Sequence, residues 1–141
     1  MNSAILNITA RYLGPVLVLL SLVVLYRGHN LPGGGFIGGL LAASGILLIV
    51  LAKDWHGMDK AWWPNPLLLL ASGLAVTVFS GVIGLLAGQD FLTGVWLPAM
   101  ELPLLGKVKL GTPLLFDVGV YLVVLGFTLK CAQALGEEFW K

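Results

Sequence analysis

Charged side chains are scarce in this chain of 141 residues, since Lys, Arg, Asp and Glu make up 11% and hydrophobic residues 58%. A soluble domain carries about 25% charged residues. Half that share could not cover the surface of a water-soluble protein of this size. A net charge of +1 also excludes the basic surface that nucleic acids require, so no nucleic-acid partner is expected. The composition therefore predicts a protein of the lipid bilayer.

Several chemical patterns are missing as well. Cys131 is the single cysteine and cannot form a disulfide within the chain. The first residues lack a basic stretch and an A-x-A-like cleavage site, so no cleavable signal peptide is expected. No metal-ligand spacing such as H-x-x-x-H or C-x-x-C occurs, nor an arrangement typical of a catalytic triad. We expect no catalytic residue, no metal, no cofactor and no enzyme activity of the chain alone.

Long apolar runs dominate what is present. A membrane-spanning helix needs about 20 apolar residues, and near-continuous apolar runs differ from the alternating pattern of barrel strands. We therefore expect an all-α, multi-pass integral membrane protein with one membrane domain. Its four transmembrane helices are predicted at about residues 5–26, 34–51, 67–87 and 112–133. The long connection 88–111 is predicted to form either a loose hairpin or an interfacial loop.

An even number of spans places both chain ends on one side of the membrane. The basic residues of that side would be Arg11, Lys53, Lys60, Lys130 and Lys141. Those of the other side would be Arg27, Lys107 and Lys109. Because basic residues favour the cytoplasmic side, this distribution predicts cytoplasmic termini.

Five glycines fall within the seven residues 33–39. A phosphate-binding loop would need a following Lys-Ser or Lys-Thr pair, and a dinucleotide loop would need a preceding strand. In a membrane helix, glycines four residues apart instead allow a neighbouring backbone to approach closely. Four helices offer few partners within the chain for so many helix faces lined by small residues. We therefore expect some of these faces to pack against other proteins. Close packing within the chain and a homo-oligomer are the alternatives.

Two polar residues lie at informative depths. Asp117 would lie roughly 6 Å into the fourth helix, where a carboxylate can relay protons or cations, or can simply be an interfacial group favoured by the helix N-terminus. His29, between the first two spans, can titrate near neutral pH or can hydrogen-bond a loop carbonyl. With cytoplasmic termini, both residues would lie on the outer side and could approach each other.

Two segments, "GHNLPGGGFIGGL" (28–40) and "GTPLLFDVGVYLVVLG" (111–126), resemble the signature segments of the MnhB/MrpB family, the B-type subunits of Mrp-type multisubunit sodium/proton antiporters. The resemblance covers most of the chain. The motif residues of the first segment are His29, Asn30, Pro32, Gly33, Gly34, Gly35, Phe36, Gly38 and Gly39. Those of the second are Gly111, Thr112, Pro113, Phe116, Asp117, Gly119 and Tyr121.

The resemblance implies a small subunit of a cation/proton antiporter in the plasma membrane of a bacterium or archaeon, beside subunits of the A, C and D types. Na⁺ and H⁺ would be the transported ions. Within that function we expect Asp117, His29 and Thr112 to be candidates for an ion path. The residues expected to serve helix packing are Pro32, Gly33, Gly34, Gly35, Gly38, Gly39 and Gly119.

Two alternatives stay open at this point, and a third is excluded. The subunit could be purely structural and carry no ion. It could also be the equivalent subunit of a membrane-bound hydrogenase or another redox-driven pump similar to complex I. A small homodimeric drug exporter would need a membrane-embedded acid in its first span, and only uncharged residues lie between Arg11 and Arg27.

Overall fold

The computed structural model describes residues 4–28, 33–53, 64–96, 100–102, 106–108 and 111–139. Within these residues the predicted fold class is confirmed, because four helices are long and apolar enough to cross a membrane. The helices are α1 (Ala4–Gly28), α2 (Gly34–Lys53), α3 (Pro66–Leu86) and α4 (Thr112–Phe139). Helix α4 runs six residues beyond the expected end at 133, because four of the five residues 134–138 are the strong helix formers Ala, Leu and Glu, which outweigh the single Gly136.

The ends of α3 show how local sequence sets a helix. Asn65 caps its start, where the side-chain Oδ1 accepts hydrogen bonds from the backbone N–H groups of Leu67 at 3.1 Å and Leu68 at 3.3 Å. Pro66 follows as the first helical residue, where its missing N–H costs nothing. At the other end Gly88 adopts a φ of +74°, a value that favours glycine and turns the chain away from the helix axis.

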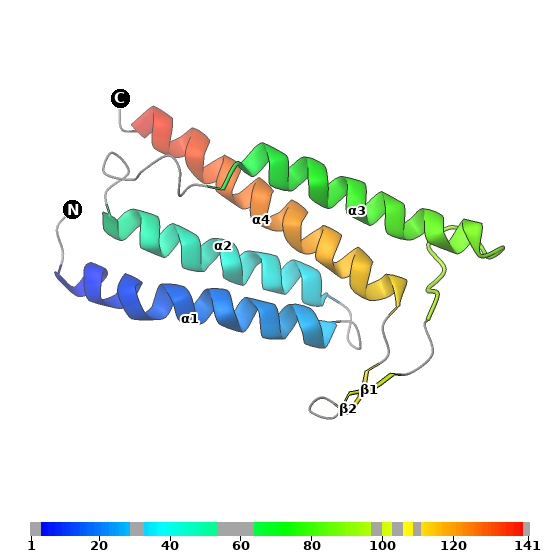
Figure 1. Ribbon diagram of the computed structural model, residues 1–141. Helices are drawn as coiled ribbons and strands as arrows, with labels where there is room; N and C mark the ends of the chain where they lie inside the picture. Colours follow the sequence, from blue (N-terminus) through cyan, green and yellow to red (C-terminus); the bar gives the residue numbers. More distant parts are fainter. Residues whose placement is uncertain are drawn as a thin grey trace.

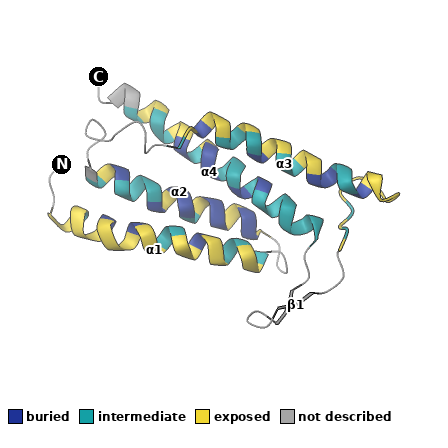
Figure 2. Cartoon of the chain, viewed as in Figure 1, coloured by how far each residue is buried: buried dark blue, intermediate teal, exposed yellow. Residues whose placement is uncertain are grey.

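The four helices lie side by side in a row rather than around a closed bundle (Figure 1). The order across the row is α1, α2, α4, α3, since α2 packs against both α1 and α4, and α3 packs against α4. Burial follows this order, and Figure 2 shows more exposed residues along α1 than along the inner helices α2 and α4. The buried core cluster comes from these two inner helices and comprises Ala42, Ala43, Tyr121, Leu125 and Leu129.

Glycines bring the neighbouring helices of the row together. On α2 they serve two sides, since a Cβ at Gly38 would lie 2.9 Å from the Ser21 carbonyl oxygen of α1, and one at Gly39 would lie 2.9 Å from the Tyr121 carbonyl oxygen of α4. Gly34 faces Gly28 of α1 in the same way. For these glycines the alternative of close packing within the chain holds, because an inner helix of the row has a close partner on each side.

A similar close approach joins α3 to α4. A Cβ at Gly73 would lie 2.7 Å from the Val123 backbone nitrogen, and a Cβ at Gly126 would lie 2.8 Å from the Leu70 nitrogen. Gly119 lies beyond the Gly73 contact, nearer the start of α4, and faces Gly73 and Thr77. Three levels of glycine contact thus hold the outer helix α3 on α4.

The connection from α3 to α4 turns back along α3. The Leu92 N–H donates to the Gly81 carbonyl at 3.4 Å, and the Thr93 N–H donates to the Asp90 carbonyl at 3.0 Å. Further on, β1 (Met100–Leu102) and β2 (Gly106–Val108) pair antiparallel. Of the two structures expected for this connection, the hairpin is the one that forms. Residues 97–99, 103–105 and 109–110 of the connection lie outside the described residues.

The helix ends are shifted along the row. Asp117 lies level with the end of α1 at Gly28 and the start of α2 at Gly35, whereas Thr112, the first residue of α4, lies level with Ser80 of α3. At 1.5 Å per residue, α4 therefore begins about 7.5 Å beyond the end of α1, and α3 ends about 9 Å beyond the start of α4. Figure 1 shows the same progressive shift.

Candidate functional site

Asp117 lies where three helices meet. Its side chain is half-buried on α4, and a Cβ at Gly28, the last residue of α1, would lie 3.0 Å from Asp117 Oδ2. The Asp117 backbone is equally close to α2, because a Cβ at Gly35 would lie 3.0 Å from its Cα atom. The glycines at the end of α1 and the start of α2 thus leave the space that this carboxylate and its backbone occupy.

The start of α2 contributes to the electrostatic surroundings of Asp117. The dipole effect of a helix N-terminus falls off within the first turn, and Asp117 is five residues beyond Thr112. The position of a Cβ on Gly28 would lie 3.0 Å from both Asp117 Oδ2 and the Gly34 nitrogen. The N–H groups of a first helical turn lack intrahelical partners and carry partial positive charge, so the start of α2 favours a carboxylate at this place.

The other polar candidate between the first two spans cannot be placed beside Asp117. His29, Asn30 and Pro32 lie outside the described residues, so a role of His29 in an ion path stays a prediction. Gly33 is described, with a φ of +92° that favours glycine, and its carbonyl accepts the first hydrogen bond of α2 from Ile37 N at 3.0 Å.

Thr112 is held by the connection and by α3. Its Oγ1 accepts a hydrogen bond from Val95 N at 3.0 Å, and its own N–H donates to the Val95 carbonyl at 3.0 Å. The Ser80 hydroxyl donates to the Thr112 carbonyl at 3.0 Å. Five residues of an α-helix correspond to about 140° around its axis, so the structure does not bring the Thr112 and Asp117 side chains to one side of α4.

Replacing Thr112 tests this anchoring role. We expect Thr112→Val to lower the free energy of unfolding by about 1 kcal/mol, because Val95 N loses its acceptor. Thr112→Ser keeps the hydroxyl and is the matched control. Thermal unfolding of the detergent-solubilised protein, followed by tryptophan fluorescence, measures the difference. Equal stability of the two variants would contradict an anchoring hydrogen bond.

Sequence reasoning missed a second polar contact near Asp117. The Ser21 Oγ of α1 and the Tyr121 hydroxyl of α4 are 3.0 Å apart and buried. Tyr121 is part of the second motif segment, but no role followed from that. Ser21 had a signal of its own, because it is the single hydroxyl-bearing serine or threonine in the otherwise apolar run 13–25.

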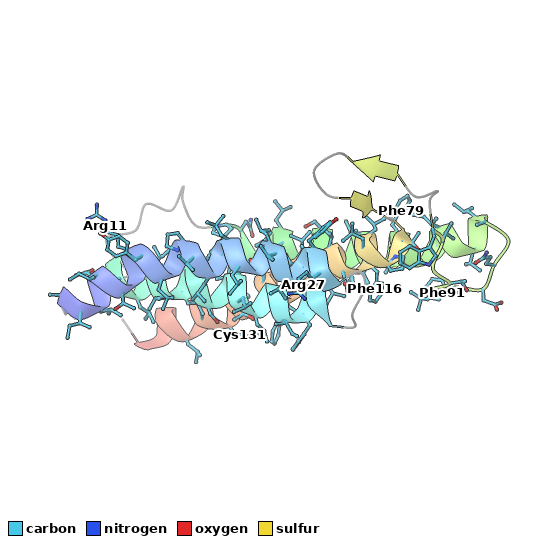
Figure 3. All side chains as sticks on the ribbon, turned by 90° about the horizontal axis from the view of Figure 1, so that it is seen from below. Arg11, Arg27, Phe79, Phe91, Phe116 and Cys131 are labelled. Atoms are coloured by element: carbon cyan, nitrogen blue, oxygen red, sulfur yellow. The ribbon has the colours of Figure 1, made fainter. Side chains whose placement is uncertain are left out.

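The other charged or reactive side chains described near the ends of the row do not form a second candidate site. Among the described residues, no group of three or more His, Cys, Asp or Glu side chains could hold a metal ion. Arg27 and Phe116 lie toward the Asp117 end of the row, whereas Arg11 lies toward the other end (Figure 3). Cys131 is exposed.

These features define a class: a multi-pass membrane protein of four spanning helices in an open row, with an acidic side chain at a three-helix junction. Residues 5–130 match the family described as "Domain related to MnhB subunit of Na+/H+ antiporter". The chain belongs to this MnhB family.

Relatives and a solved structure agree with the family. The chain is 39% identical to the B-type subunit of the Na(+)/H(+) antiporter of Bacillus subtilis (strain 168), covering 97% of this chain and 95% of that protein. It is 34% identical to a probable K(+)/H(+) antiporter protein of the combined A/B type from Rhizobium meliloti (strain 1021), covering 91% of this chain and 13% of that protein.

The fold is similar to part of a solved assembly, the Mrp complex from Dietzia sp. DQ12-45-1b, with a TM-score of 0.76 at 39% identity. This match covers 94% of the present chain but spans only 14% of the solved chain.

Proposed function

We propose that this chain acts as the B-type component of an Mrp-type multisubunit Na⁺/H⁺ antiporter in a bacterial plasma membrane, and that it contributes Asp117 to an ion path at a subunit contact. The observation that carries the ion-path role is the position of Asp117. Asp117 lies beside the end of α1 and the start of α2. The glycines at these two places lack side chains and so leave room for it. Acidic residues within membrane helices commonly line proton or cation routes.

The chemistry at this carboxylate would be exchange of a proton for a cation. An ionised carboxylate presents hard oxygen atoms that suit Na⁺, and it can take up a proton when the cation leaves. One carboxylate provides too few ligands for a complete Na⁺ site. The remaining oxygen ligands would come from a neighbouring subunit or from water, which fits a path at a subunit contact.

The A-type component of the antiporter is the partner that the relatives favour most directly. In Rhizobium meliloti the matched protein is named as a combined A/B type, of which the present chain covers 13%. Subunits of the C and D types are the other proposed partners. The open row leaves the outer faces of α1 and α3 for lipid and for these neighbours, with the termini proposed to face the cytoplasm.

Within this function the chain is a transporter component and performs no covalent chemistry. The names of the relatives include both Na⁺/H⁺ and K⁺/H⁺ antiporters. Since this chain matches the B. subtilis Na⁺/H⁺ antiporter protein over nearly its full length, we propose Na⁺ as the cation.

Reconstitution of the complete complex tests the proposal. A bacterial strain that carries the other antiporter subunits and lacks the MnhB protein would receive this chain or an empty vector. We expect Na⁺-driven proton movement in inverted membrane vesicles, and co-purification with the tagged A-type component, only when this chain is supplied. K⁺ in place of Na⁺ tests the cation. Absence of exchange despite a co-purified complete complex would contradict the proposed function.

A further inference from the structure

The Ser21–Tyr121 contact joins two helices that are not neighbours in the row. Helix α2 separates α1 from α4, and α1 and α4 approach each other at few points. Tyr121 nevertheless reaches Ser21 by passing over α2 at Gly38, where a Cβ would lie 3.2 Å from Tyr121 Cδ2 and 2.9 Å from the Ser21 carbonyl oxygen. Any side chain at Gly38 would occupy the space through which the tyrosine ring passes.

The direction of the hydrogen bonds follows from the number of protons. Ser21 has one hydroxyl proton, and its Oγ donates to the Val18 carbonyl at 2.6 Å. In the contact at 3.0 Å the Tyr121 hydroxyl is therefore the donor and Ser21 Oγ the acceptor. Ser21 is fully buried and Tyr121 is 8% exposed, so neither hydroxyl can exchange this bond for one to water.

The same three helices meet at two successive levels. At one level Gly28 of α1, Gly35 of α2 and Asp117 of α4 are in contact. Further inward, Ser21, Gly38 and Tyr121 meet, about two turns from Gly28 on α1 and about one turn from Gly35 on α2 and from Asp117 on α4. Tyr121 follows Asp117 by one helical turn, so the two side chains point to the same side of α4.

We propose that Ser21 and Tyr121 are positioning residues for Asp117. Their hydrogen bond fixes how α4 lies against the α1–α2 pair, and this sets the place of the Asp117 carboxylate at the junction. The inference rests on the proposed ion-path role of Asp117 and deepens it by naming the residues that set its cation affinity.

The two single substitutions differ in what they leave behind. Ser21→Ala leaves the Tyr121 hydroxyl as a buried donor without an acceptor, which is costly. Tyr121→Phe leaves Ser21 with its proton still bonded to the Val18 carbonyl and is milder. The double variant removes both ends of the bond, so it should resemble Tyr121→Phe rather than add the two effects.

Transport by the intact complex in inverted vesicles provides the test. We expect Ser21→Ala to raise the half-saturating Na⁺ concentration by about three- to tenfold and to shift the pH profile of exchange, with the maximal rate largely retained. Tyr121→Phe and the double variant should show smaller, similar shifts. Thr128→Val is the matched control, because its hydroxyl donates to the Val124 carbonyl of its own helix, and it should leave both readouts unchanged.

The same series separates this inference from the proposed function. If Asp117→Asn abolishes exchange while Ser21→Ala and Tyr121→Phe keep wild-type half-saturation and pH profile, the positioning role is overturned and the ion-path role stands. If Asp117→Asn has no effect in an intact complex, the ion-path role fails and the positioning role fails with it. Loss of assembly in both hydroxyl variants, on a native gel, would instead make the pair an assembly contact and overturn the inference.

Discussion

Neutralising Asp117 is expected to reduce Na⁺-driven proton movement to the level of vesicles that lack this protein, while the complex stays assembled. Asparagine has nearly the shape of aspartate and fits the same space beside Gly28 and Gly35. It cannot exchange a proton or offer a charged oxygen to a cation. Exchange in inverted membrane vesicles measures the effect, and a native gel of the same vesicles reports assembly.

Two companion variants sharpen this experiment. Asp117→Glu keeps the carboxylate and should restore part of the exchange. Asp90→Asn makes the same change of charge at an exposed turn after α3 and should have no effect. Wild-type exchange by Asp117→Asn in an intact complex would make the carboxylate a capping or interfacial group, and a purely structural role would then be the better account. Loss of the complex would identify Asp117 as a packing contact.

Enlarging Gly119 is expected to produce a large loss of stability. A Cβ there would lie 2.7 Å from the Thr77 nitrogen and 2.9 Å from the Gly73 carbonyl oxygen. Both are backbone atoms, which cannot rotate away as a side chain can. Replacing glycine with alanine in a helix gains up to about 1 kcal/mol, but overpacking a close-packed site costs about 1–3 kcal/mol per substitution. The clash therefore outweighs the gain.

We expect Gly119→Ala to lower the unfolding temperature of the detergent-solubilised complex, and Gly119→Val to reduce the amount of assembled complex on a native gel. Ala71→Val adds bulk on an exposed part of α3 and is the matched control, which should behave like the wild type. A neutral or stabilising Gly119→Ala would show that α3 and α4 do not approach as closely as the structure places them.

The four spanning helices could be predicted because each is a long apolar run, and apolar length is what a bilayer selects. Their order across the row could not, because glycines occur on α1, α2, α3 and α4 alike. A small residue indicates that the backbone of another helix can approach at that position. It does not indicate which helix this is. For this reason the sequence alone predicts that some glycines of α2 pack against other proteins. In the structure, the glycines of α2 pack against α1 and α4 of the same chain.

The candidate site was predictable in part for the same physical reason. Asp117 stands out because a carboxylate within an apolar helix is costly and so indicates a purpose. Its neighbours Gly28 and Gly35 lie 89 and 82 residues away in sequence, and only the packing of three helices reveals them. Thr112 matched a motif, but its hydrogen bonds to Val95 depend on the path of the connection, which local sequence does not determine.

The progressive shift of the helix ends has a consequence for how the protein sits in the bilayer. A flat membrane surface must pass near the ends of all four helices, yet between α1 and α3 these ends differ by about 16 Å along the helix axes. The shift builds up over three distances of about 9 Å between neighbouring helix axes. The helix axes therefore tilt from the membrane normal by roughly 30°, within the plane of the row. Such a tilt lies within the range of about 0–40° seen for membrane helices. The row therefore crosses the membrane obliquely, and an adjoining protein that packs along it must lean with it or meet it at an angle.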